Sequence, residues 1–532
     1  DYFVGVDVGT GSVRAALVAA DGTIISVATQ DILVYSTAAD FYEQSSEEIW
    51  QAVCECVQAV TDKVETSRIT GIAFDATCSL VVLDGNYHPV SVSPSGNFET
   101  NIIMWMDHRA KEQAEAINVI NDKVLSYVGG SISVEMQVPK LLWLKENMKS
   151  CWDSAAHFFD LPDFLTWRAT RSHTRSLCSV VCKMTYMAGG DAQNGWSEDF
   201  FRKIGLEDLA DNFEKIGTEA CAPGEACGLG LTSDAAKELG LNPGTAVATS
   251  IIDAHAGTLG MLSLNLSSKM ALICGTSSCH MTVSREPLFM KGIWGPYYSV
   301  IVPGMWCNEG GQSASGKLLD HIVENHPAYP AVRKEADQLG VHPHQVINSF
   351  LKTKPNSAML TGDVHIWPDF HGNRSPLADP NLRGMISGAT LATDREDLAV
   401  NYLATIQALA YSTRHILDTM KEAGQRIETI VACGGLSKND IYIQTHADVL
   451  GIKIILPEVT ESVLLGSAML AATASGLYSS VQDAMFHMGS SGELVQPNLM
   501  LQNYHNRKYE VFLKMLQHQE EYKQIMQDDK LM

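Results

Sequence analysis

The sequence is short of basic residues and has no cluster of them. It contains 38 Lys and Arg against 61 Asp and Glu, which gives a formal net charge of −23. Nucleic-acid backbones and anionic membrane surfaces are bound by clusters of Lys and Arg. We therefore expect no nucleic-acid partner and no membrane partner, and an anionic ligand would need backbone donors and a bound cation.

Long apolar runs and paired cysteines are also missing. The longest apolar stretch, 463–474, is too short and too rich in Ala, Gly and Ser to span a bilayer. No basic segment leads into an apolar one, as a secretory leader would. The 12 cysteines include no Cys-x-x-Cys pair, which indicates reduced thiols. We expect a soluble, cytoplasmic protein.

One cysteine pair has a spacing that a metal could use. Cys178 and Cys182 stand one turn apart on a possible helix. No second pair of Cys or His follows nearby in the sequence, and structural zinc sites usually need one. The sequence therefore predicts no zinc site.

Two segments share a pattern in which an apolar strand turns through Gly-Thr into a second strand. The first carries Asp7 and then Gly9-Thr10-Gly11-Ser12 before Arg14, and the second carries Gly275-Thr276-Ser277. We expect the glycines to adopt positive φ and bring backbone amides close to phosphate oxygens. Either segment alone is compatible with an ordinary Gly-rich turn. The pair predicts a duplicated fold that binds a nucleotide.

Two other phosphate motifs are excluded by their residues. Segment 9–14 has Arg14 where a dinucleotide fingerprint needs a third glycine, and a strand follows instead of a helix. Segment 311–318 resembles a P-loop, but Leu318 stands where a hydroxyl must bind Mg²⁺. We interpret it as a loop that enters a helix.

The first half of the chain predicts alternating strands and helices. Residues 2–30 favour a three-stranded meander, and Ser45 with Glu48 forms a capping box for the helix that follows. Strand 69–74 ends at Asp75, and strand 245–252 ends at Asp253, where a helix opens. Polar residues at the carboxyl ends of strands indicate a site.

The second half predicts a similar plan. Strands at 270–284 precede a longer loop region that extends to about 390, and a helix then starts at a capping box of Thr393 and Glu396. Strand 429–433 leads into Gly434-Gly435, where a flat ligand can lie against bare backbone. Strand 453–456 and helix 462–475 are expected to complete this layer, and helix 504–526 to dock on its own domain.

The two hairpins and three further segments resemble the FGGY carbohydrate kinases, and the resemblance covers nearly the whole chain. The three segments are Ser250-Ile251-Ile252-Asp253-Ala254-His255-Ala256-Gly257, Cys433-Gly434-Gly435-Leu436-Ser437-Lys438-Asn439 and His371-Gly372-Asn373-Arg374-Ser375-Pro376-Leu377. Phe74-Asp75-Ala76-Thr77-Cys78-Ser79 and Gly310-Gly311-Gln312-Ser313 are most similar to the ribulokinase branch. The resemblance implies an α/β fold of two actin-like and hexokinase-like domains of RNase-H type, with an ATP and sugar cleft between them.

The 532 residues are too many for one core, so two large domains are the default. We place an N-terminal domain with the sugar site and the catalytic aspartate at 1–260, and a C-terminal domain that binds adenosine at 261–480. Residues 481–532 are expected to form a helical tail that packs on the domains.

The resemblance also implies roles for individual residues. It makes Asp253 the catalytic base, although from local sequence that residue could instead only cap a helix. It places Asp75, Cys78, Glu135, Lys183 and Glu309 at the sugar, although isolated charges such as Lys183 and Glu309 are usually solvated. His255 is expected to pack behind Asp253. Asp7 and Asp253 are expected to hold Mg²⁺ through water. The expected nucleotide contacts are Gly9, Thr10, Gly11, Ser12, Arg14, Gly275, Thr276, Ser277, Gly434, Gly435, Ser437 and Asn439.

By this resemblance the reaction is transfer of the ATP γ-phosphate, with Mg²⁺, to the terminal hydroxyl of a pentulose. D-ribulose is the expected substrate, and the protein is expected to act as a monomer or homodimer. Alternatives remain open: the substrate can be L-ribulose, ribitol or D-xylulose, since a few pocket contacts decide this. The same architecture also serves non-catalytic ATP-dependent actin-like sensors. The residues at 129–137 depart from the family signature, which has a small residue or Pro at the position of Gln137.

Overall fold

The computed structural model describes residues 1–96, 99–190, 194–262, 266–489 and 491–528. The chain forms two compact units that are both discontinuous in sequence. Unit 1 comprises Asp1–Ser267, Thr282–Asn308 and Glu461–Ser491, and unit 2 comprises Ser268–Met281, Glu309–Thr460 and Gly492–Met532. The sequence predicted three consecutive segments instead, because local patterns do not reveal where a chain returns to an earlier unit.

The main sheet of unit 1 contains the predicted meander. Strands β1, β2 and β3 are antiparallel neighbours, and β6, β12 and β13 add parallel pairs on the other side of β1. The strand bounds are β1 Tyr2–Val8, β2 Ser12–Ala19, β3 Ile24–Asp31, β6 Ile69–Ala76, β12 Ala246–Val247 and β13 Ile251–Ile252. Parallel strands bring their carboxyl ends to one edge, where sites in α/β sheets form.

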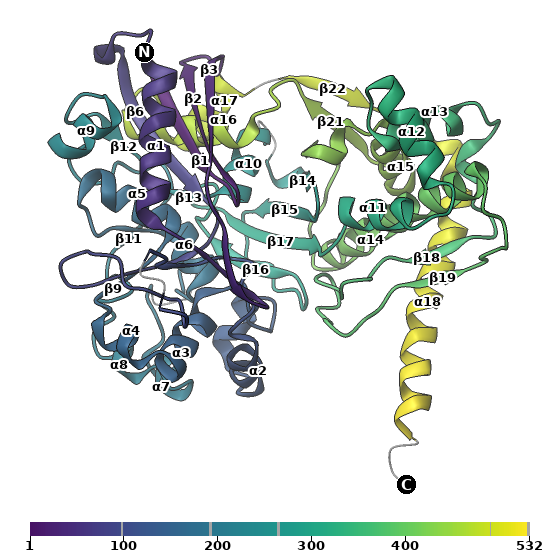
Figure 1. The fold of residues 1–532 in the computed structure, drawn as a ribbon, viewed down its shortest axis with the longest axis horizontal. Coiled ribbons are helices and arrows are strands. Elements are labelled where there is room, and N and C mark those ends of the chain that lie inside the picture. Colours follow the sequence, from purple (N-terminus) through teal and green to yellow (C-terminus); the bar gives the residue numbers. More distant parts are fainter. Residues whose placement is uncertain (97–98, 191–193, 263–265, 490, 529–532) are drawn as a thin grey trace. The chain divides into compact units, whose positions relative to one another are not determined.

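Helix α1 (Ser46–Thr61) covers one face of this sheet. The hydroxyl of Ser45 accepts the amide of Glu48, as the capping box predicted. Ile49, Val53 and Val57 recur at helical spacing and are buried in the core with the valines of β1. The helix thereby packs against β2 and β3 (Figure 1).

The rest of unit 1 is a small second sheet with helices around it. The sheet has the order β4-β5-β8-β7-β9. Its strands are β4 Tyr35–Ala38, β5 Phe41–Gln44, β7 Leu80–Leu83, β8 Ile102–Ile103 and β9 His157–Asp160. The remaining elements are α2 Lys111–Val119, α3 Gln137–Asn147, α4 Lys149–Ser154, α5 Leu161–Thr170, β10 Arg175–Ser176, α6 Leu177–Lys183, α7 Glu198–Lys203, α8 Glu207–Ala210, β11 Ala220–Cys221, α9 Ser233–Leu239, α10 Asp253–Met261, β16 Trp294–Tyr298, α16 Ser462–Ala474 and α17 Val481–Met488.

Helix α16 belongs to unit 1, which corrects the prediction that it completes a layer with the strand at 453–456. It packs against β1, β6 and α10, and Figure 1 shows this late, yellow-green helix beside the purple β1 and β2. Glycines make this close approach possible. A Cβ on Gly5 would collide with the carbonyl oxygen of Leu464, and one on Gly466 with that of Ala256. Main chain therefore meets main chain along α16.

Unit 2 is built on a sheet in the order β17-β15-β14-β20-β21-β22. The bounds are β14 Lys269–Cys274, β15 Ser278–Ser284, β17 Trp306–Gln312, β20 Thr429–Cys433, β21 Lys453–Pro457 and β22 Gly492–Val495. The predicted strands at 429–433 and 453–456 are confirmed. The chain passes between the units within β15 and within β17.

The loop region expected up to about 390 is wrong in part, because it contains β16 and β17 and, after them, three α-helices and a short strand pair. These are α11 Gly316–Glu324, α12 Tyr329–Leu339, α13 Pro343–Lys352, β18 His365–Trp367 and β19 Met385–Ser387. Pro330 and Pro343 start α12 and α13, where a proline fits the first helical turn. Segment 311–318 enters α11, as predicted.

The long helices of unit 2 follow the predicted plan with one shift. Helix α14 (Arg395–Glu422) is capped by Asp394, whose carboxylate accepts the amide of Asp397, one residue later than the predicted Thr393 box. Helix α15 (Asp440–Leu450) lies beside α14. The last helix, α18 (Gln502–Asp528), buries Tyr509 and Phe512 with Trp367 in the same unit. The predicted docking of the tail on its own domain is confirmed.

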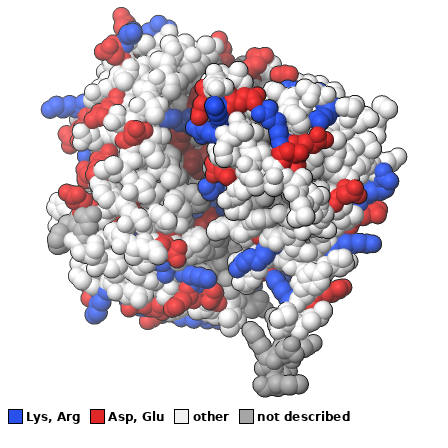
Figure 2. All heavy atoms as spheres, turned by 45° about the vertical axis from the view of Figure 1, so that its right-hand side comes forward, with Lys and Arg blue, Asp and Glu red and all other residues white. Residues whose placement is uncertain are grey.

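Charge is distributed rather than gathered on the face of the molecule that Figure 2 shows. Figure 2 shows acidic and basic side chains interspersed with uncharged residues on the face in view. All 12 cysteines are free thiols. Among the described helices, none combines the length and the hydrophobicity that crossing a bilayer requires.

The close packing of α16 predicts the effect of adding one methyl group. Gly5→Ala should lower the free energy of unfolding by about 1–3 kcal/mol, because the added carbon must displace the α16 backbone. Urea denaturation measures this change in the free energy of unfolding. In the control, Gly85→Ala, the new carbon would meet only Ala156 at 4.0 Å, and stability should stay within about 0.5 kcal/mol. Equal stabilities for the two variants would contradict the packing.

Candidate active site

Three carboxylates lie at the carboxyl edge of the unit 1 sheet. Asp7 on β1 is directly opposite Asp75 on the parallel strand β6. On the other side of β6, β13 pairs with Asp75 and ends one residue before Asp253, the first residue of α10. The sheet therefore brings together three acids that are far apart in the sequence.

The central acid is Asp75, which is completely buried. Burial raises its pKa well above the usual range, and the negative charges of Asp7 and Asp253 raise it further. The hydroxyl of Ser467 on α16 donates to Asp75 Oδ2 and partly offsets this. Asp75 consequently holds a proton to a higher pH than an ordinary aspartate does.

Arg14 neutralises the first of the three acids. Its Nε and Nη2 donate to Asp7 Oδ2 at 3.0 and 2.5 Å, and its Nη1 donates to Glu461 Oε2 at 2.5 Å. Burial lowers the pKa of Arg14, but the attraction of Asp7 outweighs that effect, so the pKa is raised. A predicted nucleotide contact is thus already engaged by two carboxylates of its own unit.

The first hairpin is tight and firmly held. The amide of Gly9 donates to the carbonyl of Ser12 at 2.9 Å, and Trp105 Nε1 donates to the Thr10 hydroxyl at 3.0 Å. The expectation of positive φ at Gly9 and Gly11 is wrong, because the turn closes without a left-handed residue there. A Cβ on Gly11 would meet nothing within 4 Å. The glycine leaves open space for a ligand.

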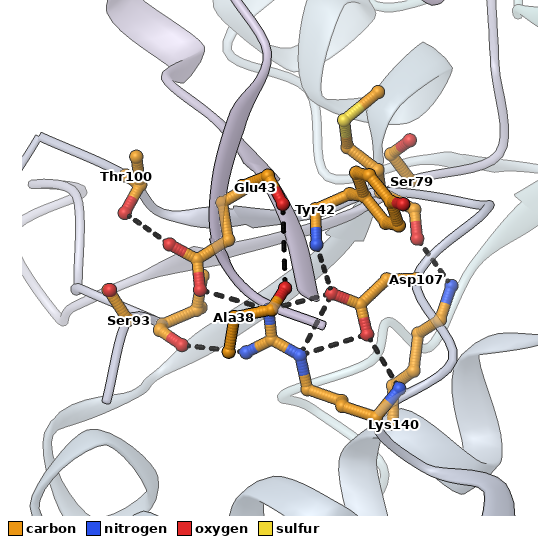
Figure 3. Close-up of polar contacts among 12 residues, drawn as sticks. Ala38, Tyr42, Glu43, Ser79, Ser93, Thr100, Asp107 and Lys140 are labelled. Carbon is orange, nitrogen blue, oxygen red and sulfur yellow. Dashed lines mark hydrogen bonds and ion pairs between the residues drawn. The ribbon is translucent and has the colours of Figure 1, made fainter. Parts of the chain in front are cut away.

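Trp105 is supported by a buried ion-pair network behind this hairpin. Arg109 is paired with Glu43 at 2.9 Å and with Asp107 at 2.7 Å, all without exposed side-chain surface. The hydroxyl of Thr100 donates to Glu43 at 2.9 Å (Figure 3). A buried charge pair is tolerated when its partners are satisfied in this way. The network fixes the loop that carries Trp105.

Asp253 is the first residue of α10 and is partly exposed. Its Oδ1 accepts the amide of Ala254 at 2.7 Å. The N-cap position belongs to Ile252, and Asp253 is the first helical residue. A carboxylate at the first turn of a helix is stabilised in its ionised form.

Lys183 ends α6 and is only 4% exposed, which rules out a solvated helix residue. Its Nζ lies 5.0 Å from the centre of the Trp294 ring. Cys78 follows β6 and is buried, and burial raises the pKa of its thiol to about 12. The charges of Lys183 and Asp253 both act on that thiol, so the three predicted residues share one neighbourhood.

The sequence analysis missed Asp160, which ends β9. This acid is fully buried, and burial raises its pKa well above the usual range, an effect that the charge of Lys183 partly offsets. Gln137 Nε2 donates to Oδ1 at 2.7 Å, while Oδ2 has no hydrogen-bond partner among the described residues. A buried, unsatisfied acceptor beside a lysine is suited to a ligand hydroxyl. The sequence offered one indication of a site at Asp160, because this acid stands where a strand ends and a helix with Pro in its first turn begins.

Glu135 stands on a loop that a buried lysine holds. Lys140 Nζ donates to the carbonyls of Met104 at 2.9 Å and of Glu135 at 3.3 Å. Burial lowers the pKa of Lys140 to about 8. The Glu135 side chain remains partly exposed. The departure at Gln137 is accommodated, since that side chain binds Asp160.

Unit 2 contains a pocket of about 950 Å³ around its own hairpin. Four predicted nucleotide contacts line it, namely Gly275, Thr276, Gly435 and Asn439. The other lining residues are Gly316, Asp320, Glu335, Leu339, Val341, His342, His344, Gln345, Val346, Asn348, Ser349, Lys352, Leu436, Lys438 and Asp440. A cavity of this size can hold a nucleoside.

The second hairpin is bonded to the start of α11. Gly275 donates to the carbonyl of Ser277 at 2.8 Å, and the amides of Ser315 and Gly316 donate to the carbonyls of Thr276 and Gly275, each at 2.9 Å. Gly275, like the glycines of the first hairpin, has no positive φ. The hairpin is therefore a rigid wall of the pocket.

The two glycines after β20 are required for different reasons. Gly434 has φ of +95°, and a Cβ there would collide with the carbonyl of Cys274, so that position requires glycine. A Cβ on Gly435 would meet nothing within 4 Å, because it faces the pocket. Ser437 donates to the carbonyl of Gly434 at 2.7 Å, and Asn439 Nδ2 to the Tyr402 hydroxyl at 2.7 Å.

Two groups in unit 2 differ from the expectations. Glu309 is a buried residue of β17, 6% exposed, rather than a solvated loop charge. Asp320, His342 and His344 line the pocket and were not predicted, since they lie in the region taken as loop. Nε2 of His344 is 3.3 Å from Oδ1 of Asp320, and this contact lowers the pKa of Asp320.

Comparisons with known proteins show the family of the chain. The model of the N-terminal domain of the FGGY family of carbohydrate kinases matches residues 2–260, and that of its C-terminal domain matches residues 270–475. A human protein named FGGY carbohydrate kinase domain-containing protein is 51% identical over 546 residues, 99% of this chain and 98% of that protein.

A D-ribulokinase of Saccharomyces cerevisiae is 40% identical over 514 residues, which cover 89% of this chain and 72% of the yeast protein. The crystal structure of xylulose kinase from Rhodospirillum rubrum is similar with a TM-score of 0.82 at 18% identity, covering 98% of this chain and 99% of that chain. The predicted α/β fold of two domains is confirmed.

The contrast between the two glycines predicts a separation of binding from stability. Gly435→Val should weaken binding of a non-hydrolysable ATP analogue about tenfold or more, about 1.4 kcal/mol, because the side chain enters the pocket. Its melting temperature should stay near that of the parent. Gly434→Ala should instead lower the melting temperature, since its carbon meets backbone. Calorimetric titration measures the affinity for the ATP analogue, and thermal unfolding measures the melting temperature. An unchanged affinity in Gly435→Val would show that the nucleotide does not bind in this pocket.

Proposed function

Because the chain belongs to the FGGY family of carbohydrate kinases and uses ATP to phosphorylate a sugar, we propose that its substrate is a pentulose. In this proposal the γ-phosphoryl group moves to the terminal primary hydroxyl of D-ribulose and gives D-ribulose 5-phosphate. The observation that carries the substrate is the 40% identity to a D-ribulokinase over most of both chains. The buried setting of Cys78, Lys183 and Asp160 supports a small polyhydroxylated ligand.

Asp253 is the proposed catalytic base. A sugar hydroxyl becomes a better nucleophile when a carboxylate accepts its proton as the oxygen–phosphorus bond forms and the bond to ADP breaks. Asp253 is partly exposed, so a substrate can reach it. The pKa of the buried neighbour Asp75 is raised by burial and by the charges of Asp7 and Asp253.

The proposed nucleotide site uses backbone more than charge. The amides of Thr10 and Gly11 are proposed as donors at the first hairpin, where a Cβ on Gly11 would meet nothing within 4 Å, and the unit 2 pocket is suited to adenosine. Ser12 and Ser277 are proposed as further hydroxyl and amide donors, and Arg14 as a positive charge behind Asp7. Preorganised backbone donors can balance phosphate charge in a protein of high negative charge.

Asp7 and Asp253 are the proposed holders of Mg²⁺, through water. Their oxygen donors lie at one sheet edge and suit a hard cation that keeps most of its hydration shell. When bound, such a cation would neutralise charge on the phosphates. The Arg14 contact occupies one oxygen of Asp7 and leaves outer-sphere contact as the suitable mode.

For the sugar we propose Lys183 as a donor and Glu309 as an acceptor, with Cys78, Asp75 and Glu135 nearby. Asp160 is added to this set because one of its buried oxygens has no partner among the described residues. A cytoplasmic location and a monomer or homodimer remain predictions.

A substrate panel tests the proposed function. ADP formation should be fastest, by kcat/KM, with D-ribulose among D-ribulose, L-ribulose, D-xylulose and ribitol. A preference for any of the other three would identify a different sugar kinase. Tight ATP binding with no sugar-dependent ADP formation anywhere in the panel would favour the non-catalytic sensor.

Replacement of the proposed base tests the mechanism. Asp253→Asn should keep ATP affinity and lose about 10²–10⁴-fold in kcat, because the amide cannot accept the proton. The matched control is Asp234→Asn on the exposed side of α9, which should turn over normally. Turnover of Asp253→Asn at the rate of the control would remove Asp253 from the mechanism.

A further inference from the structure

Three side chains with soft or imidazole donors meet in the core of unit 1. Cys178 and Cys182 lie one turn apart on α6, and His255 lies in the first turn of α10. One donor atom of each lies within 4.8 Å of the others, and all three residues are buried. The spacing of the two cysteines was visible in the sequence, but the histidine was not linked to them because it follows Cys182 by 73 residues.

The distances fit tetrahedral coordination. Cys182 Sγ and His255 Nε2 are 3.6 Å apart. A sulfur at about 2.3 Å and a nitrogen at about 2.0–2.1 Å from one zinc ion are about 3.5 Å apart at the tetrahedral angle. The spacing of this pair therefore matches that of two ligands of one zinc ion, and the third donor lies within 4.8 Å of both.

The surroundings favour ligation too. The amide of Ile252 donates to Cys178 Sγ at 3.4 Å, the kind of outer contact that orients a ligating sulfur. The thiol of Cys307 is also buried and acts electrostatically on Cys182.

We propose that Cys178, Cys182 and His255 bind a thiophilic divalent cation of the zinc class that ties α6 to α10. On binding, the two S–H bonds break, two metal–sulfur bonds form, and both protons pass to solvent. Helix α6 ends at Lys183 and α10 begins at Asp253. The ion would therefore set the spacing of two residues that we assign to the sugar and to catalysis, whichever sugar is the substrate.

Metal analysis of the purified full chain tests this proposal. After dialysis against metal-free buffer, mass spectrometry should find about one zinc per chain. Cys182→Ser should lose it, whereas Cys56→Ser should keep it, because Cys56 is also buried but its thiol donates to the carbonyl of Val13 at 3.5 Å and lies outside the cluster. Zinc retained by Cys182→Ser overturns the site.

A second measurement does not depend on whether the variants fold. The parent chain, stripped with a chelator under reducing conditions, should take up Co²⁺ and develop a near-ultraviolet thiolate-to-cobalt band, and its melting temperature should rise with the metal. Absence of both zinc in the purified chain and the cobalt band refutes the proposal. Neither readout uses sugar or ATP, so a wrong substrate leaves this test unaffected.

Discussion

The electrostatics of three converging carboxylates constrain the rest of unit 1. Asp7, Asp75 and Asp253 share one sheet edge. Neighbouring carboxylates repel one another when ionised, so all three cannot be charged without compensation. Two interactions compensate this repulsion. Arg14 pairs with Asp7, and the pKa of the buried Asp75 is raised while the hydroxyl of Ser467 donates to its carboxyl group. Because Ser467 is on α16, the acids depend on a helix that reaches the sheet only where glycines let backbones touch. Chemistry and packing are coupled at this edge.

Much of the fold is readable from local sequence. The meander at 2–30, the Ser45 cap and the strand at 429–433 follow from alternation, turn residues and a hydroxyl in the right place. The pocket of unit 2 was also within reach, because the Gly-Thr turn and Gly434-Gly435 mark places where backbone must stay bare. Such features depend on neighbours a few residues apart, which a sequence displays directly.

What was missed depends on distant contacts. Helix α16 was expected beside 453–456, but it packs on β1 and β6, a preference that its uniformly apolar sequence does not reveal. Lys183 and Glu309 were given solvated alternatives, although both are buried, because an isolated charge carries no local sign of its partners. The helices at 329–352 were taken as loop since each is short. The value of glycine in the hairpins is the absent side chain rather than a positive φ.

The late return of α16 and α17 to unit 1 affects how the chain folds during synthesis. Strands β1 and β6 emerge from the ribosome early, yet the helix that covers them is made only after nearly all of unit 2. Until then one apolar sheet face stays uncovered, and such surfaces promote aggregation. The nascent chain would need protection by chaperones, and a product truncated before residue 461 would retain that uncovered face permanently.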